Sequence, residues 1–448
     1  MKTKHLSLIL LAALLPLPSA AEPPKDDTHA VVLLDARLYA ATKPLLDEYV
    51  KAAAKRRGFG IVVDSVEGLD DLPFEKVREK VRSLRKDHPA LEGVLFVGNV
   101  QLPSFYSPRG DNFQTRYLPH AYEDLDLVLE KKLKPGDRHV DSTDPKHVVP
   151  EHDFDFLDRG PEPGVELWAA FLPVGLADAK ANTYEAWAKQ LEPFFRKAIA
   201  FHTGKTAIPR RLYKVSNQLW NLGPAWAYYG PQRIDFYAVN PRAKGSVKAG
   251  TPAEKFCALP PEKAYVRAPM ENFPTWEKFQ EWYGRHEWMG EGWQKDTILI
   301  SHLNKTSYDA AWLNVHSCED FSLVNSAQAR AVTKGALVML LSGCGVGGYR
   351  QPGNESFVDT SCAPENNILC AWVYGSSQSL AALGDPFNRG HECYYERMIE
   401  WLTKGEYLGL AHRKRLQCHY EGTPPPAELK ENLMEMLIGD PFVDIKGR

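Results

Sequence analysis

The sequence predicts an α/β fold, built on a largely parallel sheet with helices on both faces. Short apolar runs bounded by Gly, Pro, Asn or Asp recur along the chain and are typical of buried strands. Segments with apolar residues at helical spacing alternate with these runs, which indicates strand-helix-strand units. The chain has 448 residues and is 44% apolar, which is enough for one large domain or two subdomains.

The first half of the chain shows this alternation most clearly. Its predicted strands are 29–39, 61–66, 93–98 and 167–175, and its predicted helices are 42–57, 74–88 and 181–202. Residues 103–164 are rich in Asp, His, Pro and Gly, so we expect a long surface excursion there.

The second half continues the pattern. Its predicted strands are 207–215, 297–303, 310–315, 336–341 and 369–374, and its predicted helices are 276–286, 323–334, 391–404 and 427–437. Residues 220–292 are rich in Trp, Tyr and Pro. Such aromatic residues either form the walls of a substrate site or pack between elements, and packing is the commoner role.

Two apolar runs are each followed by a reactive side chain. The run 310–315 leads to His316, and the run 336–341 leads to Cys344 through Ser342 and Gly343. In parallel sheets, reactive groups lie just beyond the carboxyl ends of the strands, so neighbouring strands would bring the imidazole and the thiol together. The imidazole can accept the thiol proton and later protonate a leaving amine. The alternative is a small buried cysteine and an unrelated hydrogen-bonded histidine.

Several motifs resemble the cysteine peptidases of the caspase, legumain and gingipain group, and more narrowly the gingipain-type peptidase domain. They are the apolar run ending in His316, the segment 342–347 around Cys344, VLFVGNVQLP (94–103), LWAAFLPVG (167–175) and LIGDPFVDI (437–445). The resemblance spans roughly residues 91–445. It implies a caspase-like sheet and a cysteine endopeptidase that acts on proteins or peptides and needs no cofactor. Cys344 would be the nucleophile and His316 the general acid/base.

The resemblance also suggests the remaining site residues. Backbone N–H groups at Ser317, Gly343 and Gly345 are the expected oxyanion donors. Two positions depart from the family pattern, because Ser317 stands where the family has Gly, and Ala170-Phe171 replaces its Gly-Arg.

Acidic residues provide the other candidates. Asp124 is the first choice for an acid that orients the catalytic imidazole. The clusters 123–126 and 153–155 are alternatively able to bind calcium, or are solvated loops. Glu319 and Asp320 are candidate substrate-binding residues for a basic side chain. His302 competes with His316 for the imidazole role, but it lies inside its apolar run.

Two other classes of function stay open. One is a catalytically inactive caspase-like protein that binds a peptide or partner. The other is a disulfide protein in which Cys344 is bridged, for example to Cys318.

The N-terminus predicts export. Residues 1–21 combine Lys2 and Lys4 with a short apolar core and a small-residue cleavage site, which is typical of a signal peptide. The mature chain would then be secreted or periplasmic, with subdomains 22–205 and 206–448, the second being the caspase-like catalytic one. Outside the cytoplasm disulfides can form, and three bridges among the seven cysteines, with Cys344 left as a thiol, would suit a thiol enzyme. The alternative is that most of the cysteines are reduced and buried.

The remaining composition argues against other partners. The net charge is -3, and the basic run 412–415 is interpreted as a solvated helix face, so we expect no nucleic-acid partner. No later apolar run approaches the roughly 20 residues of a membrane span. No cysteine pair has the spacing of a zinc site, and we expect no metal centre of that kind.

Overall fold

The computed structural model of the chain places most of the sequence. It describes residues 27–109, 112–117, 119–131, 153–157, 164–216, 222–239, 241–243, 265–288, 297–314, 317–318, 321–322, 324–343, 345–349, 362–384, 395–418 and 435–445.

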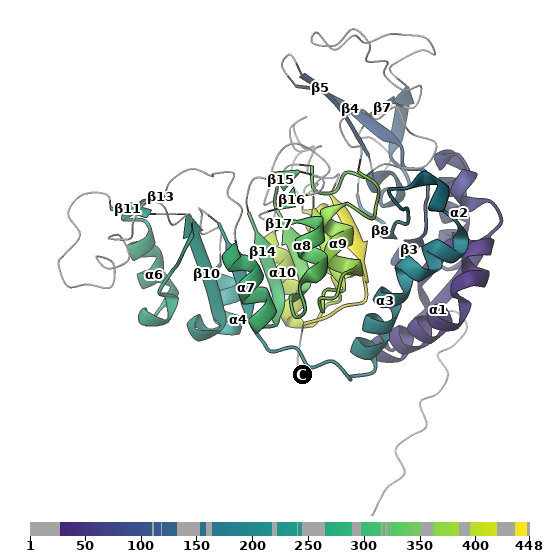
Figure 1. The fold of residues 1–448 in the computed structure, drawn as a ribbon. Coiled ribbons are helices and arrows are strands. Elements are labelled where there is room, and N and C mark those ends of the chain that lie inside the picture. The colour runs from purple at the N-terminus through teal and green to yellow at the C-terminus, as the bar shows by residue number, and fades with distance from the viewer. Residues whose placement is uncertain are drawn as a thin grey trace, which may run out of the picture.

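Eleven of the described strands form one sheet, in the order β12-β10-β9-β14-β18-β19-β20-β8-β3-β1-β2 (Figure 1). These strands are β1 (Thr28–Asp35), β2 (Gly60–Val66), β3 (Gly93–Val97), β8 (Trp168–Leu172), β9 (Leu212–Val215), β10 (Ile234–Val239), β12 (Tyr265–Arg267), β14 (Tyr308–Leu313), β18 (Ala336–Leu341), β19 (Ala381–Gly384) and β20 (Met436–Gly439). Most neighbours are parallel, while β12 and β20 pair antiparallel with β10 and β19. The predicted α/β class with a largely parallel sheet is confirmed.

Helices cover the sheet in two layers. One connected layer contains α1 (Ala36–Arg57), α3 (Tyr184–His202), α7 (Thr297–Lys305), α8 (Ser326–Ala331) and α9 (Ile368–Tyr374). The other contains α2 (Phe74–Asp87), α4 (Gly223–Tyr229), α10 (Tyr395–Lys404) and α11 (Leu408–Gln417), and α6 (Trp276–Tyr283) lies near β10 (Figure 1). The connection through α1 leads from β1 outward to the edge strand β2. The connection through α2 leads from β2 back across β1 to β3. Right-handed connections in opposite directions place their helices on opposite faces.

Smaller sheets and turns stand beside the main sheet. The sheets are formed by β4 (Ser104–Arg109), β5 (Asn112–Tyr117), β6 (Val128–Lys131) and β7 (Asp153–Leu157), by β15 (Ser317–Cys318), β16 (Phe321–Ser322) and β17 (Val324–Asn325), and by β11 (Pro241–Ala243) with β13 (His286–Trp288). The 3-10 turns are η1 (Leu69–Asp71), η2 (Pro119–Tyr122), η3 (Ala179–Ala181), η4 (Pro231–Arg233) and η5 (Met270–Asn272). The predicted excursion 103–164 therefore contains a sheet of its own, which projects from the main sheet in Figure 1.

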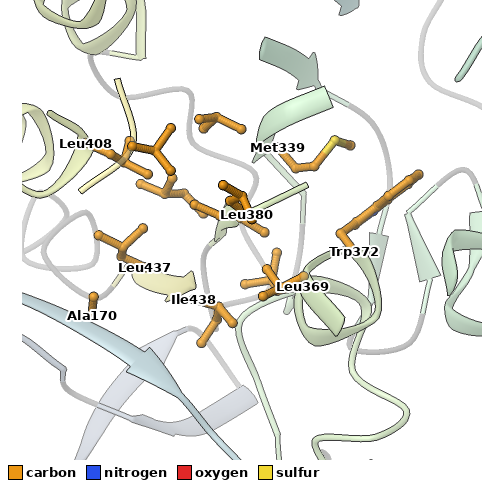
Figure 2. Packing of buried hydrophobic residues seen from close by; sticks show 14 of the residues in the cluster. Ala170, Met339, Leu369, Trp372, Leu380, Leu408, Leu437 and Ile438 are labelled. Carbon is orange, nitrogen blue, oxygen red and sulfur yellow. The ribbon is translucent and has the colours of Figure 1, made fainter. Parts of the chain in front are cut away.

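The core lies on both faces of the central strands. In β20, Leu437 points toward Leu408 of α11, while Ile438 points toward Leu369 of α9 (Figure 2). This follows from the period of two in a strand, which sends successive side chains to opposite faces. Fully burying a leucine or isoleucine contributes about 1.5–3 kcal/mol, so a strand that is apolar at every position is stabilised from both sides.

Two predicted strands are helices. Residues 297–303 belong to α7, and residues 369–374 belong to α9. Every residue of α9 is buried, so its sequence shows no polar face and reads like a buried strand. The end of the predicted helix 427–437 is also wrong, because Met436 and Leu437 begin β20. Length and periodicity cannot separate helix from strand in such short apolar runs.

The two predicted subdomains share one sheet. Residues 203–211 connect α3 with β9 along one edge of the sheet (Figure 1), and the proposed boundary at 205 falls in this connection. Beyond β20, Asp440 accepts hydrogen bonds from Tyr49 of α1 at 2.9 Å and from the Phe442 N–H at 2.9 Å, and lies 2.7 Å from His202 Nε2 of α3. The division into 22–205 and 206–448 stays a prediction. Among the described helices, none combines the length and apolar character needed to cross a membrane.

Candidate active site

The adjacent ends of β14 and β18 form the centre of the candidate site. The two strands are parallel and in register, with Leu313 opposite Leu341, and the Ser342 N–H donates to the Leu313 carbonyl at 2.8 Å. Every residue of both strands is buried, including Asp309 of β14, and this burial on both faces specifies the register of the pair. His316 and Cys344 themselves lie outside the described residues. Each follows its strand by the same number of positions, three.

A row of buried polar residues directly follows three neighbouring strands. Ser216 follows β9, Asn314 follows β14 and Ser342 follows β18, and each is buried. The Asn314 side chain donates to Ser216 Oγ at 3.4 Å, and the indole N–H of Trp312 donates to Ser342 Oγ at 3.2 Å. Each of these three uncharged residues is hydrogen-bonded to a neighbouring strand or to the residue that follows it, so the ordered structure continues one residue beyond the strands.

The turn that follows Cys344 is closely packed. Gly345 has a φ of 69°, a left-handed conformation that favours glycine, and the Gly348 N–H donates to the Gly345 carbonyl at 2.9 Å. Val346 is fully buried against β19: a Cβ added to Gly384 would lie 2.3 Å from Val346 Cγ2. Of the predicted oxyanion residues, Gly343 and Gly345 therefore lie at the end of β18 and at the start of this turn.

A buried asparagine holds the same turn. Asn367 donates through Nδ2 to the carbonyls of Val346 at 2.9 Å and Gly348 at 2.7 Å. Its Oδ1 accepts from the N–H groups of Leu369 and Cys370 and so caps α9. Asn367 was not among the predicted site residues, because 369–374 was predicted to be a strand and not a helix. An asparagine just before an apolar run is a helix-start signal that could have identified it.

The segment after β14 is a small sheet. Ser317 and Cys318 of β15 pair with Ser322 and Phe321 of β16, and the Ser317 hydroxyl donates to Ser322 Oγ at 3.1 Å. The predicted helix 323–334 begins only at Ser326, after β17. The predicted substrate-binding residues Glu319 and Asp320 lie outside the described residues.

Asp124 is buried beside η2 and β8. Its Oδ1 accepts from the Asp126 N–H at 3.0 Å, and its Oδ2 lies 3.9 Å from His120 Nε2. Burial raises the pKa of Asp124 above its ordinary value, although His120 and Arg78 oppose the shift. In the sheet, β19 and β20 separate β8 from β18, a span of roughly 14 Å at the usual strand spacing. Its assignment as the acid that orients His316 stays a prediction.

A second polar cluster lies beneath α11, and we call it the α11 cluster: His120, Glu123, His412, Arg415 and Glu435. Glu123 Oε1 lies 3.0 Å from His412 Nε2, and its Oε2 lies 3.3 Å from His120 Nδ1. Arg415 pairs with Glu435, and all five side chains are buried.

Two pKa shifts follow from this arrangement. Burial opposes the ionisation of Glu123, but its hydrogen bonds with His120 and His412 hold its pKa below the ordinary value. Burial lowers the pKa of His412, although Glu123 favours the charged ring. The ionised Glu123 thus faces a neutral His412 at neutral pH.

The α11 cluster corrects one prediction. The basic run 412–415 is not simply a solvated helix face: His412 and Arg415 point inward and are buried, while Arg413 and Lys414 are partly exposed. His412 and Arg415 therefore both face the interior, because helical spacing places positions three apart on the same face.

The other imidazole candidate has a structural partner. His302 lies on α7, and its Nε2 is 2.6 Å from the Tyr237 hydroxyl. The aromatic residues between 220 and 292 pack on one another, as in the group Trp226, Phe236, Phe273, Trp276, Phe279 and Trp282. For these residues, core packing between elements is the role that the structure supports.

The predicted arrangement of three disulfides is wrong. No bridge joins any two of the four described cysteines, Cys318, Cys362, Cys370 and Cys418. Three bridges that leave Cys344 unbridged would use the other six cysteines, and four of those six are the described ones. At least one bridge would then have to join two described cysteines.

The acidic clusters 123–126 and 153–155 are the predicted calcium candidates. Within the described part of the chain, no group of three or more His, Cys, Asp or Glu residues could hold a metal ion. The side chains of the cluster 153–155 are not among those described. In the cluster 123–126, Glu123 is already bonded to two imidazoles. Calcium binding stays a prediction.

Comparison with known proteins gives one structural likeness. No family model matches the chain. No curated protein matches it either. The crystal structure of the Arg-specific cysteine proteinase gingipain R is similar to the chain with a TM-score of 0.48 and 11% identity, over 95% of this chain and 80% of that chain. The α/β class rests on the sheet topology above, and the function proposed below rests on the sequence motifs and the strand ends.

Proposed function

We propose that the chain is an exported cysteine endopeptidase, with Cys344 as the nucleophile and His316 as the general acid/base. The observation that carries this proposal is the in-register pairing of β14 and β18, two adjacent parallel strands. The only histidine in 308–318 and the only cysteine in 336–349 follow these strands at the same distance along the chain. Side chains beyond neighbouring parallel strand ends share one edge of a sheet, where enzymes of this class place reactive groups.

The proposed reaction is hydrolysis of a peptide bond. His316 accepts the Cys344 proton, and the thiolate attacks the scissile carbonyl carbon. The protonated imidazole then donates that proton to the leaving amine as the C–N bond breaks, which leaves a thioester on Cys344. Water, deprotonated by His316, hydrolyses the thioester and releases the acid.

Backbone N–H groups around Cys344 are the proposed oxyanion donors. Gly343 and Gly345 flank the nucleophile, and Ser317 directly follows His316. Donors fixed in the fold before reaction stabilise the developing charge without reorganisation, and one such donor is worth roughly 100- to 1,000-fold in kcat. The ordered strand end and the packed turn support this role for Gly343 and Gly345.

A second candidate function is a non-catalytic peptide-binding protein of the same fold. Ser317 favours it, because this residue is buried, its hydroxyl is bonded to Ser322, and its backbone lies in a paired strand. A serine in place of glycine also has less backbone freedom beside a reacting group.

The two functions are separated by assaying the mature chain, residues 22–448, on a peptide library. We expect Cys344→Ala and His316→Ala each to lower kcat by more than about 1,000-fold while the far-UV circular dichroism stays unchanged. Equal cleavage by the parent and Cys344→Ala would exclude Cys344 as the nucleophile. N-terminal sequencing of the exported protein tests the cleavage site, with Glu22 expected as the first residue.

Alkylation with iodoacetamide provides an independent measure with an internal control. Cys370 is fully buried in α9, and burial raises the pKa of its thiol above the ordinary value, so it should react slowly. A catalytic Cys344 should be labelled first, and the His316→Ala variant should slow this labelling at neutral pH. Labelling of Cys344 as slow as that of Cys370, together with peptide binding, would support the non-catalytic function.

A further inference from the structure

We propose that Asn367 is a positioning residue of the thiol site, which fixes the turn after Cys344 by tying it to the N-terminus of α9. The inference rests on the proposed function, because a positioning role requires a reactive Cys344. It adds a residue that lies 23 positions beyond the nucleophile in the sequence and belongs to a different element.

The contacts of Asn367 use both ends of its carboxamide. Its Nδ2 donates to two carbonyls of the turn, those of Val346 and Gly348, and its Oδ1 accepts from two N–H groups of α9. The side chain is fully buried, so water does not compete for these bonds. Asparagine is suited to this role because its side chain carries donors and an acceptor at opposite sides of one short planar group.

These bonds set the direction of the peptide planes in the turn. In a planar trans peptide, the N–H points opposite to the carbonyl of the preceding residue. Holding the Val346 carbonyl toward Asn367 therefore directs the Gly347 N–H to the opposite side. Gly347 is buried, and its N–H makes no hydrogen bond within the described part of the chain. Buried N–H groups of this kind are rare, and they are suited to binding an anionic oxygen.

The turn has a second constraint that makes the role of Asn367 specific. Val346 packs against Gly384, which prevents the turn from moving toward β19. Asn367 prevents it from moving away from α9. The backbone beyond Cys344 is therefore held between a strand and a helix, and loss of the amide donors releases only one of these constraints.

Two substitutions separate the donors from the helix cap. In Asn367→Ser the hydroxyl still caps α9, because serine and asparagine are equally good N-caps, but the shorter side chain cannot hold the two turn carbonyls. Asn367→Asp keeps the size and the cap, but an ionised carboxylate donates no hydrogen bond. Asn325→Ser is the matched control, because Asn325 is exposed and its side chain caps a different helix, α8, by accepting from the Gln328 N–H.

The experiment measures kcat, KM and melting temperature of the mature parent and the three variants. We expect Asn367→Ser to lower kcat about 100-fold with KM changed less than about 3-fold, as misplacement of a reacting group by about 1 Å does. Asn325→Ser should leave both constants unchanged. The ratio of Asn367→Asp kcat to parent kcat should rise as the pH falls, because the protonated carboxyl regains one donor. That recovery would not follow from a purely structural role.

The outcomes distinguish this inference from the proposed function. A parent that neither cleaves peptides nor reacts with iodoacetamide at Cys344 overturns both. An active parent whose kcat is unaffected by Asn367→Ser and by Asn367→Asp overturns the positioning role alone. If Asn367→Ser does not fold, the isosteric Asn367→Asp decides: a kcat ratio independent of pH rejects the role, and a ratio that rises in acid supports it.

Discussion

The two polar regions of the molecule, the thiol edge and the α11 cluster, are organised by different forces. At the edge formed by the ends of β9, β14 and β18, the hydrogen bonds named above join hydroxyls, amides and backbone groups, while the buried Lys214 of β9 lies with its Nζ 3.1 Å from the centroid of the Trp312 ring. Beneath α11, the groups are carboxylates, imidazoles and a guanidinium, all withdrawn from water. The edge is shaped by packing and neutral hydrogen bonds, whereas the cluster is held by charge.

This difference shows where the acidic residues of the 123–126 segment are used. The triad pattern predicts a carboxylate near a catalytic imidazole, and Glu123 does contact two imidazoles. These belong to His120 and His412, and they tie η2 and α11 to β8. A buried ionic network of this kind needs every partner, because an unpaired charge inside a protein is strongly unfavourable. It follows that substitutions that remove a charged side chain should lower stability most in the α11 cluster. Substitutions that change side-chain volume should lower stability at the thiol edge and displace its turn.

The largest stability effect is expected at Glu123. Its replacement in Glu123→Ala leaves two buried imidazoles without their hydrogen-bond partner. At about 1–3 kcal/mol for each unsatisfied group, we expect a loss of about 2–6 kcal/mol in the free energy of unfolding, measured by urea denaturation. The matched control is Glu192→Ala, which breaks an exposed pair with Arg196 on α3 and should cost about 0–1 kcal/mol. Equal losses in the two variants would show that the α11 cluster is not held by charge.

A smaller loss of stability is expected when side-chain volume is added at the thiol edge. The added Cβ in Gly384→Ala meets the stiff branched side chain of Val346, so we expect a loss of about 1–3 kcal/mol in stability and a displaced turn after Cys344. The double variant Gly384→Ala with Val346→Ala removes the clash and should recover part of the stability. Urea denaturation of the parent, Gly384→Ala, Val346→Ala and the double variant measures this coupling, and strictly additive losses would contradict direct packing of the two residues.

The smallest effect is expected on the pH dependence of the free energy of unfolding. This pH dependence should change with substitutions in the α11 cluster and not with substitutions at the thiol edge. The folded pKa of His412 lies below its unfolded value of about 6.5, so the unfolded chain binds the proton first as the pH falls. The folded pKa of Glu123 is also lowered, so its contribution is present above its unfolded pKa and is lost as the pH falls through the folded one. Both shifts predict lower stability in acid.

The expected slope for one such group is at most about 1.4 kcal/mol per pH unit, beginning near pH 6.5. Urea denaturation at several pH values should show a shallower slope for His412→Gln than for the parent. Gly384→Ala should keep the parent slope, because no charged group is changed at the thiol edge. A parent slope retained by His412→Gln would mean that another group titrates in this range.

The fold was largely predictable where local pattern and tertiary context agree. The strand at 336–341 was predicted with its observed bounds, and α1, α2 and α3 were found with shifted ends. The errors at 297–303 and 369–374 share one cause, since an element buried all round carries no periodic signal. At the candidate site, the end of β18 and its adjacency to β14 followed from apolar runs, whereas β14 ends at Leu313, two residues before the predicted end, and Asn367 was not predicted.

The sequence by itself determined the α/β class, the order of most elements and the two chemically distinctive residues that follow β14 and β18, because these depend on local periodicity and on the rules of parallel sheets. Only the tertiary structure decided which polar residues meet. Glu123 and His412 are 289 positions apart, and Asn367 contacts a turn about 20 positions earlier. Such contacts arise from the packing of whole helices on the sheet, which no short stretch of sequence encodes.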